Sequence, residues 1–221
     1  MSLPRALPVL LLPLLAACTP VFNDDFEADP ANGAPLASPA GNPAGDAVET
    51  GAGQGKIFVT TALPLKGAQS LKLEGPSGMT SPRVFLRAAP IADQTKPVFL
   101  SWSGRLASGA EVEILIVKVE NEGVPLRLNF EQGIVYANGN SIGTYAGTNP
   151  HGVFVSLNPA TDKWAVNLTG SAATGDGKAA TGAFPNASDF PAFHLVVTVH
   201  LKNASGASGY WMDNVKVSHW K

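Results

Sequence analysis

The segment AEVEILIVKVE, residues 110–120, decides the fold class of this 221-residue chain. In an extended strand, Val112 and the isoleucines at every second position after it would share one face, because successive side chains point to opposite faces. Leu115 and Val117 would share the other face. A strand that is apolar on both faces is typical of the middle of a sheet. We therefore expect residues 110–120 to form a central strand.

On both sides of this segment, short runs rich in Val, Ile, Leu, Phe and Thr are separated by Gly, Pro, Asn and Asp. The runs predict strands and the separating residues predict turns. Beyond the first 17 residues, the apolar spacing of a helix nowhere persists for three turns. The sequence therefore predicts an all-β fold. We expect strands at 21–27, 56–61, 69–74, 82–89, 97–103, 110–120, 124–130, 133–137, 141–145, 151–157, 163–169, 193–201 and 209–218.

Two of the predicted strands have one polar face. Residues 126–131 alternate Leu, Leu and Phe with Arg127, Asn129 and Glu131, and residues 194–201 alternate in the same way. This pattern indicates strands with one face in solvent, and those faces are where a ligand would bind. Trp102 and Trp164 alternate in phase with apolar neighbours, so we assign both to the core.

The N-terminus has the features of a secretory signal. Arg5 precedes an apolar run, residues 6–17, that is shorter than a membrane span and is interrupted by Pro8 and Pro13. Cys18 follows directly and is the only cysteine of the chain, so it has no disulfide partner within the molecule. One interpretation is that Cys18 occurs by chance at the end of an ordinary signal peptide. The other interpretation, that Cys18 carries a lipid, follows from a resemblance to a known family.

Residues 15–18, Leu-Ala-Ala-Cys, resemble the lipobox of bacterial lipoproteins. The resemblance implies that residues 1–17 are removed and that Cys18 is acylated, which anchors the chain to a membrane. In such lipoproteins, an Asp directly after the cysteine favours retention in the inner membrane. This chain has Thr19 at that position, so the resemblance implies the outer membrane. It does not assign the periplasmic or the surface face.

We expect three regions in the chain: a signal peptide at 1–17, a lipid-anchored N-terminus at 18–21, and one β-sandwich domain at 22–221. Within the domain, residues 28–55 are rich in Ala, Gly and Pro and contain no aromatic residue. Such a composition buries too little apolar surface to offset the entropy of ordering it. It therefore predicts a long loop.

Three short pieces of the chain resemble the concanavalin A-like lectin/glucanase superfamily, which includes laminin G-like and polysaccharide-binding jelly rolls. They are DDFE at 24–27, GAQSLKL at 67–73 and YWMDNVKV at 210–217. The resemblance implies a two-sheet antiparallel jelly-roll sandwich whose first and last strands pair. It also implies that Phe26, Trp211 and Val215 are buried together.

The same resemblance implies a structural Ca²⁺ near the paired terminal strands. Asp25, Glu27 and Asp213 match the positions of the ligands in related carbohydrate-binding jelly rolls, and Ca²⁺ requires such oxygen ligands. The alternative is that these carboxylates only cap turns through hydrogen bonds.

Enzymes of this superfamily carry carboxyl groups in a Glu-x-Asp-x-x-Glu pattern that flanks a glycosidic bond. Here the nearest match begins at Glu111, with Glu113 in place of the Asp and Ile116 in place of the acid/base Glu. Without that carboxyl, no proton is delivered to the leaving group, so we predict no catalysis. His194 and His200 cannot share a metal, because six strand residues separate them by about 20 Å.

Composition and side-chain chemistry narrow the ligand class. A net charge of −2, with only 14% charged residues, provides no field that would attract nucleic acid. Sugar binding uses aromatic faces together with amide and carboxylate groups. The candidates of this kind are Tyr136, Tyr145, Arg127, Asn129, Glu131, Asn138 and Asn140.

The leading hypothesis is a non-catalytic outer-membrane lipoprotein whose jelly-roll domain binds a glycan or another envelope component. The alternative is a structural or assembly lipoprotein that acts through protein contacts and has no sugar site. A degenerate hydrolase is the third hypothesis.

Overall fold

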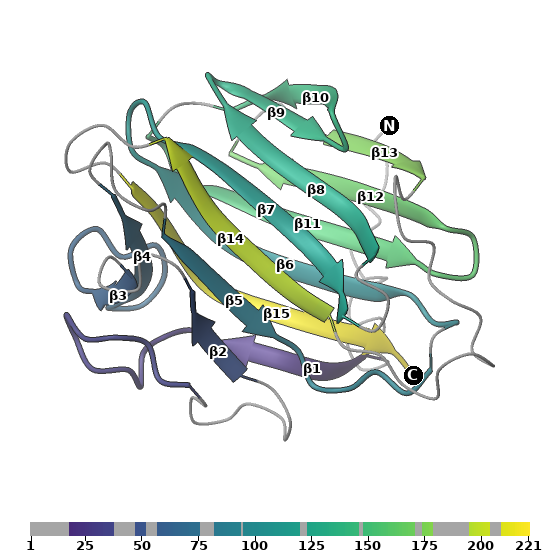
Figure 1. Ribbon diagram of the computed structural model, residues 1–221, viewed down its shortest axis with the longest axis horizontal. Helices are drawn as coiled ribbons and strands as arrows, with labels where there is room; N and C mark the ends of the chain where they lie inside the picture. The colour runs from purple at the N-terminus through teal and green to yellow at the C-terminus, as the bar shows by residue number, and fades with distance from the viewer. Residues whose placement is uncertain are drawn as a thin grey trace, which may run out of the picture.

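The computed structural model describes residues 18–37, 47–51, 57–75, 82–93, 95–119, 123–145, 148–170, 174–178, 195–203 and 209–221. Within these ranges the chain forms β-strands and no α-helix (Figure 1). They are β1 (Cys18–Asp24), β2 (Ala47–Thr50), β3 (Ile57–Thr60), β4 (Ser70–Glu74), β5 (Arg83–Arg87), β6 (Val98–Leu106), β7 (Glu111–Lys118), β8 (Gly123–Glu131), β9 (Ile134–Ala137), β10 (Asn140–Thr144), β11 (His151–Asn158), β12 (Lys163–Thr169), β13 (Thr174–Lys178), β14 (Leu195–Asn203) and β15 (Gly209–Trp220).

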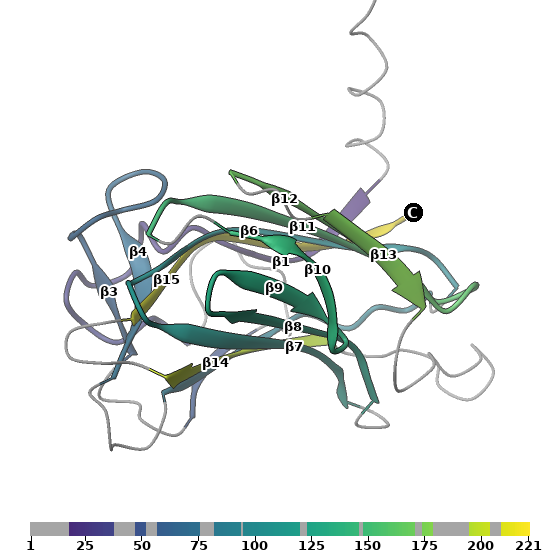
Figure 2. The ribbon, with the colours of Figure 1, turned by 90° about the horizontal axis from the view of Figure 1, so that it is seen from above.

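The strands form two antiparallel sheets that pack face to face (Figure 2). Sheet A has the order β13-β12-β11-β6-β15-β4-β3, and β1 also pairs with β15. Sheet B has the order β10-β9-β8-β7-β14-β5-β2. The all-β prediction and the two-sheet jelly-roll sandwich are therefore confirmed.

The core lies between the two sheets and follows from the alternation of the strands. β7 is the fourth of the seven strands of sheet B, with Val112, Ile114 and Ile116 fully buried on its inner face. This confirms the central strand predicted from residues 110–120. Trp102 and Trp164 are also buried in the core, as predicted.

The last strand differs in one respect from the prediction. Trp211 is not packed with Phe26 and Val215 in the core, because it lies on the outer face of sheet A, where the Lys72 ammonium covers its ring at 4.9 Å. β15 is irregular between Asp213 and Lys216, and Asn214 has a positive φ of 51°. This bulge reverses the alternation, so that Tyr210 and Met212 before it and Val215 after it point into the core.

β1 begins and ends three residues earlier than the predicted strand at 21–27. Its end is set by a local turn, in which the Asp24 carboxylate accepts a hydrogen bond from the Phe26 backbone N–H at 2.8 Å and Phe26 has a φ of 58°. At its start, Cys18 lies opposite Trp220, and Pro20 lies opposite Ser218. Residues 18–20, which precede the expected start of the domain at residue 22, thus pair with β15 of the sandwich.

Two strands were not predicted. β2 lies inside the expected loop 28–55, where Val48 is buried and pairs with Leu86 of β5. The surrounding Ala, Gly and Pro residues give this segment the composition of a loop, and Val48 alone does not produce the apolar pattern of a strand. β13 has the sequence TGDGK and pairs with β12, but it contains no apolar pattern that sequence analysis could detect.

The predicted signal peptide at 1–17 lies outside the described residues, as do positions 38–46 and 52–55 of the expected loop and position 56 of the expected strand 56–61. Among the residues that the structure describes, no helix is long and apolar enough to cross a membrane.

A close contact in the core requires a glycine at position 104. A Cβ there would overlap the Tyr210 hydroxyl and the His151 Nε2 atom, and Tyr210 is fixed by a hydrogen bond from Trp102 Nε1 at 3.0 Å. Gly104→Ala should lower the free energy of unfolding by about 1–3 kcal/mol, the range for overpacked cores. Urea denaturation measures this, with the outward-facing neighbour Ser103→Ala as control. Equal stability of the two variants would contradict the packing described.

Burial lowers the pKa of His151 to about 4, although a backbone hydrogen bond to Asn149 opposes the shift. The unfolded state, with a histidine pKa of about 6.5, binds more protons between pH 6.5 and 4. The free energy of unfolding should therefore fall by up to about 3 kcal/mol as the pH is lowered through that range. His151→Phe keeps the stacking on Phe130 and should flatten this pH dependence. Denaturation series at several pH values test it, and identical slopes for the two proteins would refute it.

Candidate functional site

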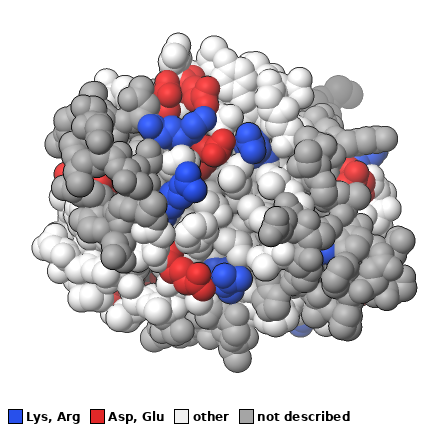
Figure 3. Space-filling view, in the orientation of Figure 1, with Lys and Arg blue, Asp and Glu red and all other residues white. Residues whose placement is uncertain are grey.

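The outer face of sheet B carries a row of polar side chains that crosses five strands. The strand register places Asn129 opposite both Tyr136 and Glu113. It also places Glu113 opposite His200, and His200 opposite Arg83. We call these five residues the polar row. Because directly opposite residues share a face, all five side chains project from the outer face of sheet B. Figure 3 shows this side of the molecule, where acidic and basic groups lie in contact.

Glu113 is the electrostatic centre of this row. Its carboxylate lies 3.8 Å from Arg127 Nε, 3.7 Å from His200 Nδ1 and 3.9 Å from Lys202 Nζ. Lys202 also reaches Glu131 at 3.4 Å. The Glu113 side chain is only 14% exposed, so these contacts are partly shielded from water. The carboxylate is therefore held in place by donors from two neighbouring strands.

His200 provides the imidazole of the row. Burial lowers the pKa of its imidazole, the positive charge of Arg83 lowers it further, and Glu113 opposes both effects. The ring is therefore neutral at pH 7, with one nitrogen that donates and one that accepts a hydrogen bond.

Most of the predicted ligand residues lie on this face. Arg127 and Glu131 flank the polar row on β8, and Tyr136 and Asn129 belong to it. Asn138 has a structural role instead: its side chain accepts a hydrogen bond from Arg127 N at 2.9 Å and donates to Pro125 O at 3.3 Å. The side chain of Asn140 donates to Asn138 O at 3.5 Å. Both stabilise the turn between β9 and β10.

Tyr145 is separate from the other predicted ligand residues. Its ring packs edge-on against buried Phe130, with 5.5 Å between centroids, and burial raises the pKa of its hydroxyl. It borders a hollow of about 410 Å³ at one end of the sandwich, together with Glu111 and Thr148. The structure thus does not bring Tyr145 to the polar row.

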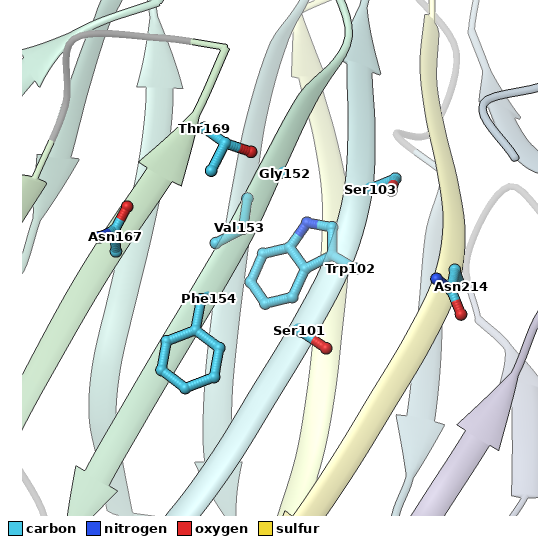
Figure 4. A pocket seen from close by; sticks show the side chains of 9 residues that line it. All are labelled: Ser101, Trp102, Ser103, Gly152, Val153, Phe154, Asn167, Thr169 and Asn214. Carbon is cyan, nitrogen blue, oxygen red and sulfur yellow. The ribbon is translucent and has the colours of Figure 1, made fainter. Parts of the chain in front are cut away.

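A second hollow, of about 400 Å³, lies on the outer face of sheet A (Figure 4). Small side chains leave the space, and Phe154, which is 47% exposed, lies beside Asn167. Sequence analysis did not single out this group. The available signal was the position of Phe154 between Val153 and Val155, which places its ring on the outer face. The lining residues are Ser101, Trp102, Ser103, Gly152, Val153, Phe154, Asn167, Thr169 and Asn214.

Two of the three predicted calcium ligands hold a loop through hydrogen bonds. Glu27 Oε1 accepts from the backbone N–H groups of Ala68 and Gln69 at 2.8 and 3.1 Å. Asp213 Oδ2 accepts from Lys66 N at 2.8 Å and from the Ser70 hydroxyl at 3.0 Å. These contacts bring together the three pieces of sequence that carry the family resemblance.

The third predicted ligand, Asp25, accepts a local hydrogen bond from Glu27 N at 3.2 Å. Among the described residues, no group of three or more His, Cys, Asp or Glu side chains is placed to hold a metal ion. Asp213 Oδ1 is buried and accepts no hydrogen bond within the described ranges. A calcium ion at Asp25, Glu27 and Asp213 thus stays a prediction, and the turn-capping alternative accounts for the contacts described.

The residues of β7 that partly match the glycosidase pattern lie on opposite faces of the strand. Glu113 projects outward from β7, whereas Ile116 is fully buried in the core. The position that corresponds to the acid/base Glu therefore does not face the polar row. His194 lies outside the described residues.

No protein-family model matches this chain, and no curated protein matches it. Solved structures with a similar fold include winged bean acidic lectin in complex with methyl-α-D-galactose, at 11% identity and a TM-score of 0.52, covering 92% of this chain and 98% of that one. Ulex europaeus lectin I, in complex with the methyl glycoside of α-L-fucose, has 9% identity, a TM-score of 0.52 and the same coverage.

A sialidase is also similar, at 15% identity and a TM-score of 0.51, over 78% of this chain. The chain spans only 18% of the length of that sialidase. At these identities the similarities establish the concanavalin A-like lectin fold, without a shared activity.

The interactions of His200 give a direct test of the polar row. Glu113→Gln removes the charge that raises the pKa of His200, so this pKa should fall further below 6.5. Arg83→Gln removes a charge that lowers it, so the pKa should rise. NMR titration of the imidazole protons, assigned with His200→Gln, measures both shifts. A higher His200 pKa in Glu113→Gln would contradict the arrangement.

Proposed function

We propose that this chain is a lipid-anchored protein of the outer membrane that binds a glycan or another envelope component and catalyses no reaction. The observation that carries the proposal is the polar row, which combines an aromatic ring, an amide, a carboxylate, an imidazole and a guanidinium group on one sheet face. The lectin-like fold supports the same class of ligand.

The chemistry of the row suits a saccharide. Sugar hydroxyls both donate and accept hydrogen bonds, and their C–H faces pack on aromatic rings. Glu113 would accept hydrogen bonds from neighbouring hydroxyls, while Arg127 and neutral His200 would donate to others. Tyr136, at one end of the row, would provide the ring. Because Glu113 is already oriented by its ion pairs, binding costs little additional ordering.

Three features of the N-terminus support the envelope location. Residues 15–18 match a lipobox, Cys18 is the only cysteine, and Thr19 follows it. Each acyl methylene transferred into the bilayer contributes about 0.8 kcal/mol, so two or more chains give stable attachment. A structural Ca²⁺ at Asp25, Glu27 and Asp213 is part of the proposal, and the same binding experiment tests it in the presence of chelator.

The full chain, purified with its anchor in detergent, should bind members of an array of glycans and peptidoglycan fragments. Glu113→Gln should weaken binding to a hit at least about 10-fold, because a charged hydrogen-bond acceptor contributes about 1.5–3 kcal/mol. The matched control is Glu49→Gln, which lies on the same face but pairs with Arg87 at 3.2 Å outside the polar row. It should leave the affinity within about twofold.

Two results would overturn the glycan assignment. Equal binding by Glu113→Gln and wild type would remove the polar row as the site. Absence of binding by folded protein, with and without calcium, would favour the structural or assembly role through protein contacts. Loss of binding in chelator would support the calcium ion, and binding that chelator leaves unchanged would argue against it.

A further inference from the structure

Three aromatic side chains form a continuous cluster on the outer face of sheet A. The ring of Phe99 on β6 stacks on Phe154 of β11, with centroids 6.0 Å apart and planes at 24°. It also meets Trp220 of β15 edge-on, with centroids 6.4 Å apart. We call Phe99, Phe154 and Trp220 the aromatic face. Phe154 is among the few exposed large apolar residues within the described ranges.

The same face carries the first residue of the expected mature chain. Cys18 lies opposite Trp220 in the pairing of β1 with β15. Opposite residues of an antiparallel pair share a face, with Cβ atoms about 4.5–5.5 Å apart. An acyl group on Cys18 would therefore start beside the indole of Trp220, with no linker between the anchor and the sandwich. Figure 2 shows the start of β1 and the C-terminus close together on the sheet A side.

We propose that the aromatic face lies against the headgroup region of the bilayer that holds the lipid on Cys18. This inference rests on the lipid anchor of the proposed function. An anchor without a linker keeps sheet A within contact distance of the membrane, and tryptophan and other aromatic rings favour the bilayer interface. Docking in this orientation directs the outer face of sheet B, with its polar row, away from the bilayer.

The charges on this side of the molecule fit an anionic lipid surface. Lys163 of β12 and Lys216 of β15 are exposed, and Lys221 directly follows Trp220. Among the described residues of β1, β3, β4, β6, β11, β12 and β15, the carboxylates are Asp24 and Asp213, which are both buried, and Glu74, which pairs with Lys72. Lysines close to an anionic membrane surface are attracted to it. A bilayer containing anionic lipid is therefore the occupant that we assign to this surface.

In this orientation, the outer face of sheet A would be turned toward the membrane and the outer face of sheet B toward the solution, so the two faces would meet different ligands. The hollow beside Phe154 (Figure 4) lies on the same face as the anchor. Its hydroxyl and amide groups, including Asn167 and Thr169, would face lipid headgroups. A glycan in solution would instead meet sheet B.

Tryptophan fluorescence tests the docking, because Trp102, Trp164 and Trp211 are buried whereas Trp220 is partly exposed. The full chain with its anchor is reconstituted into vesicles of phosphatidylcholine and phosphatidylglycerol at about 3:1. Brominated phosphatidylcholine then serves as a quencher of limited range. We expect quenching in wild type and a severalfold smaller effect in Trp220→Phe.

A double substitution, Phe99→Ser with Phe154→Ser, should reduce the quenching of Trp220 while the protein still floats with the vesicles. The matched control is Val119→Ser, a similarly exposed apolar residue that directly follows β7 of sheet B. It should leave the quenching unchanged. Circular dichroism verifies that each variant is folded.

The possible results separate the anchor from the docking. Flotation with quenching that depends on Trp220 supports the aromatic face as the contact. Flotation with equal fluorescence in brominated and ordinary lipid overturns the docking and leaves the anchor intact. Absence of flotation overturns both. The glycan measurement with Glu113→Gln is independent of all three results.

Discussion

The arrangement of sheet A depends on the pairing of β15 with three other strands. β15 pairs with β6 along much of its length, with β4 at its start and with β1 at its end. The change of partner coincides with the bulge after Asp213. At this point the Asp213 carboxylate binds the segment between β3 and β4. One irregularity in β15 thus marks the point at which this strand changes its partner from β4 to β1.

The loop beside this bulge is stabilised by the side chains of Gln69 and Glu27, which form hydrogen bonds with backbone groups of the loop. The Gln69 side-chain amide donates to the carbonyls of Phe26, Glu27 and Asp29. In the opposite direction, the Glu27 carboxylate accepts hydrogen bonds from the backbone N–H groups of residues 68 and 69. Buried backbone groups in a turn must find such partners. The short sequence pieces that resemble the lectin superfamily therefore fix the conformation of the backbone beside the bulge of β15.

The two outer faces of the sandwich differ in chemistry, and this difference organises the functional interpretation. Sheet B presents ion pairs around Glu113, and sheet A presents Phe99, Phe154 and Trp220 beside the start of β1. A protein anchored by its first residue has a fixed relation to the membrane only if that residue lacks a linker. Because Cys18 lies within β1, the lipid proposed on Cys18 would be attached to the sandwich without a linker.

The sequence by itself determined the all-β class, the central position of residues 110–120 and the core assignments of Trp102 and Trp164, because alternation is a local property of a strand. It also indicated the polar face of β8 with Arg127 and Asn129. Only the tertiary structure decided that His200 and Arg83 join this face, because strand order and register depend on contacts between distant segments. It likewise decided that Trp211 points outward, since a bulge changes the alternation without a clear signal in the sequence.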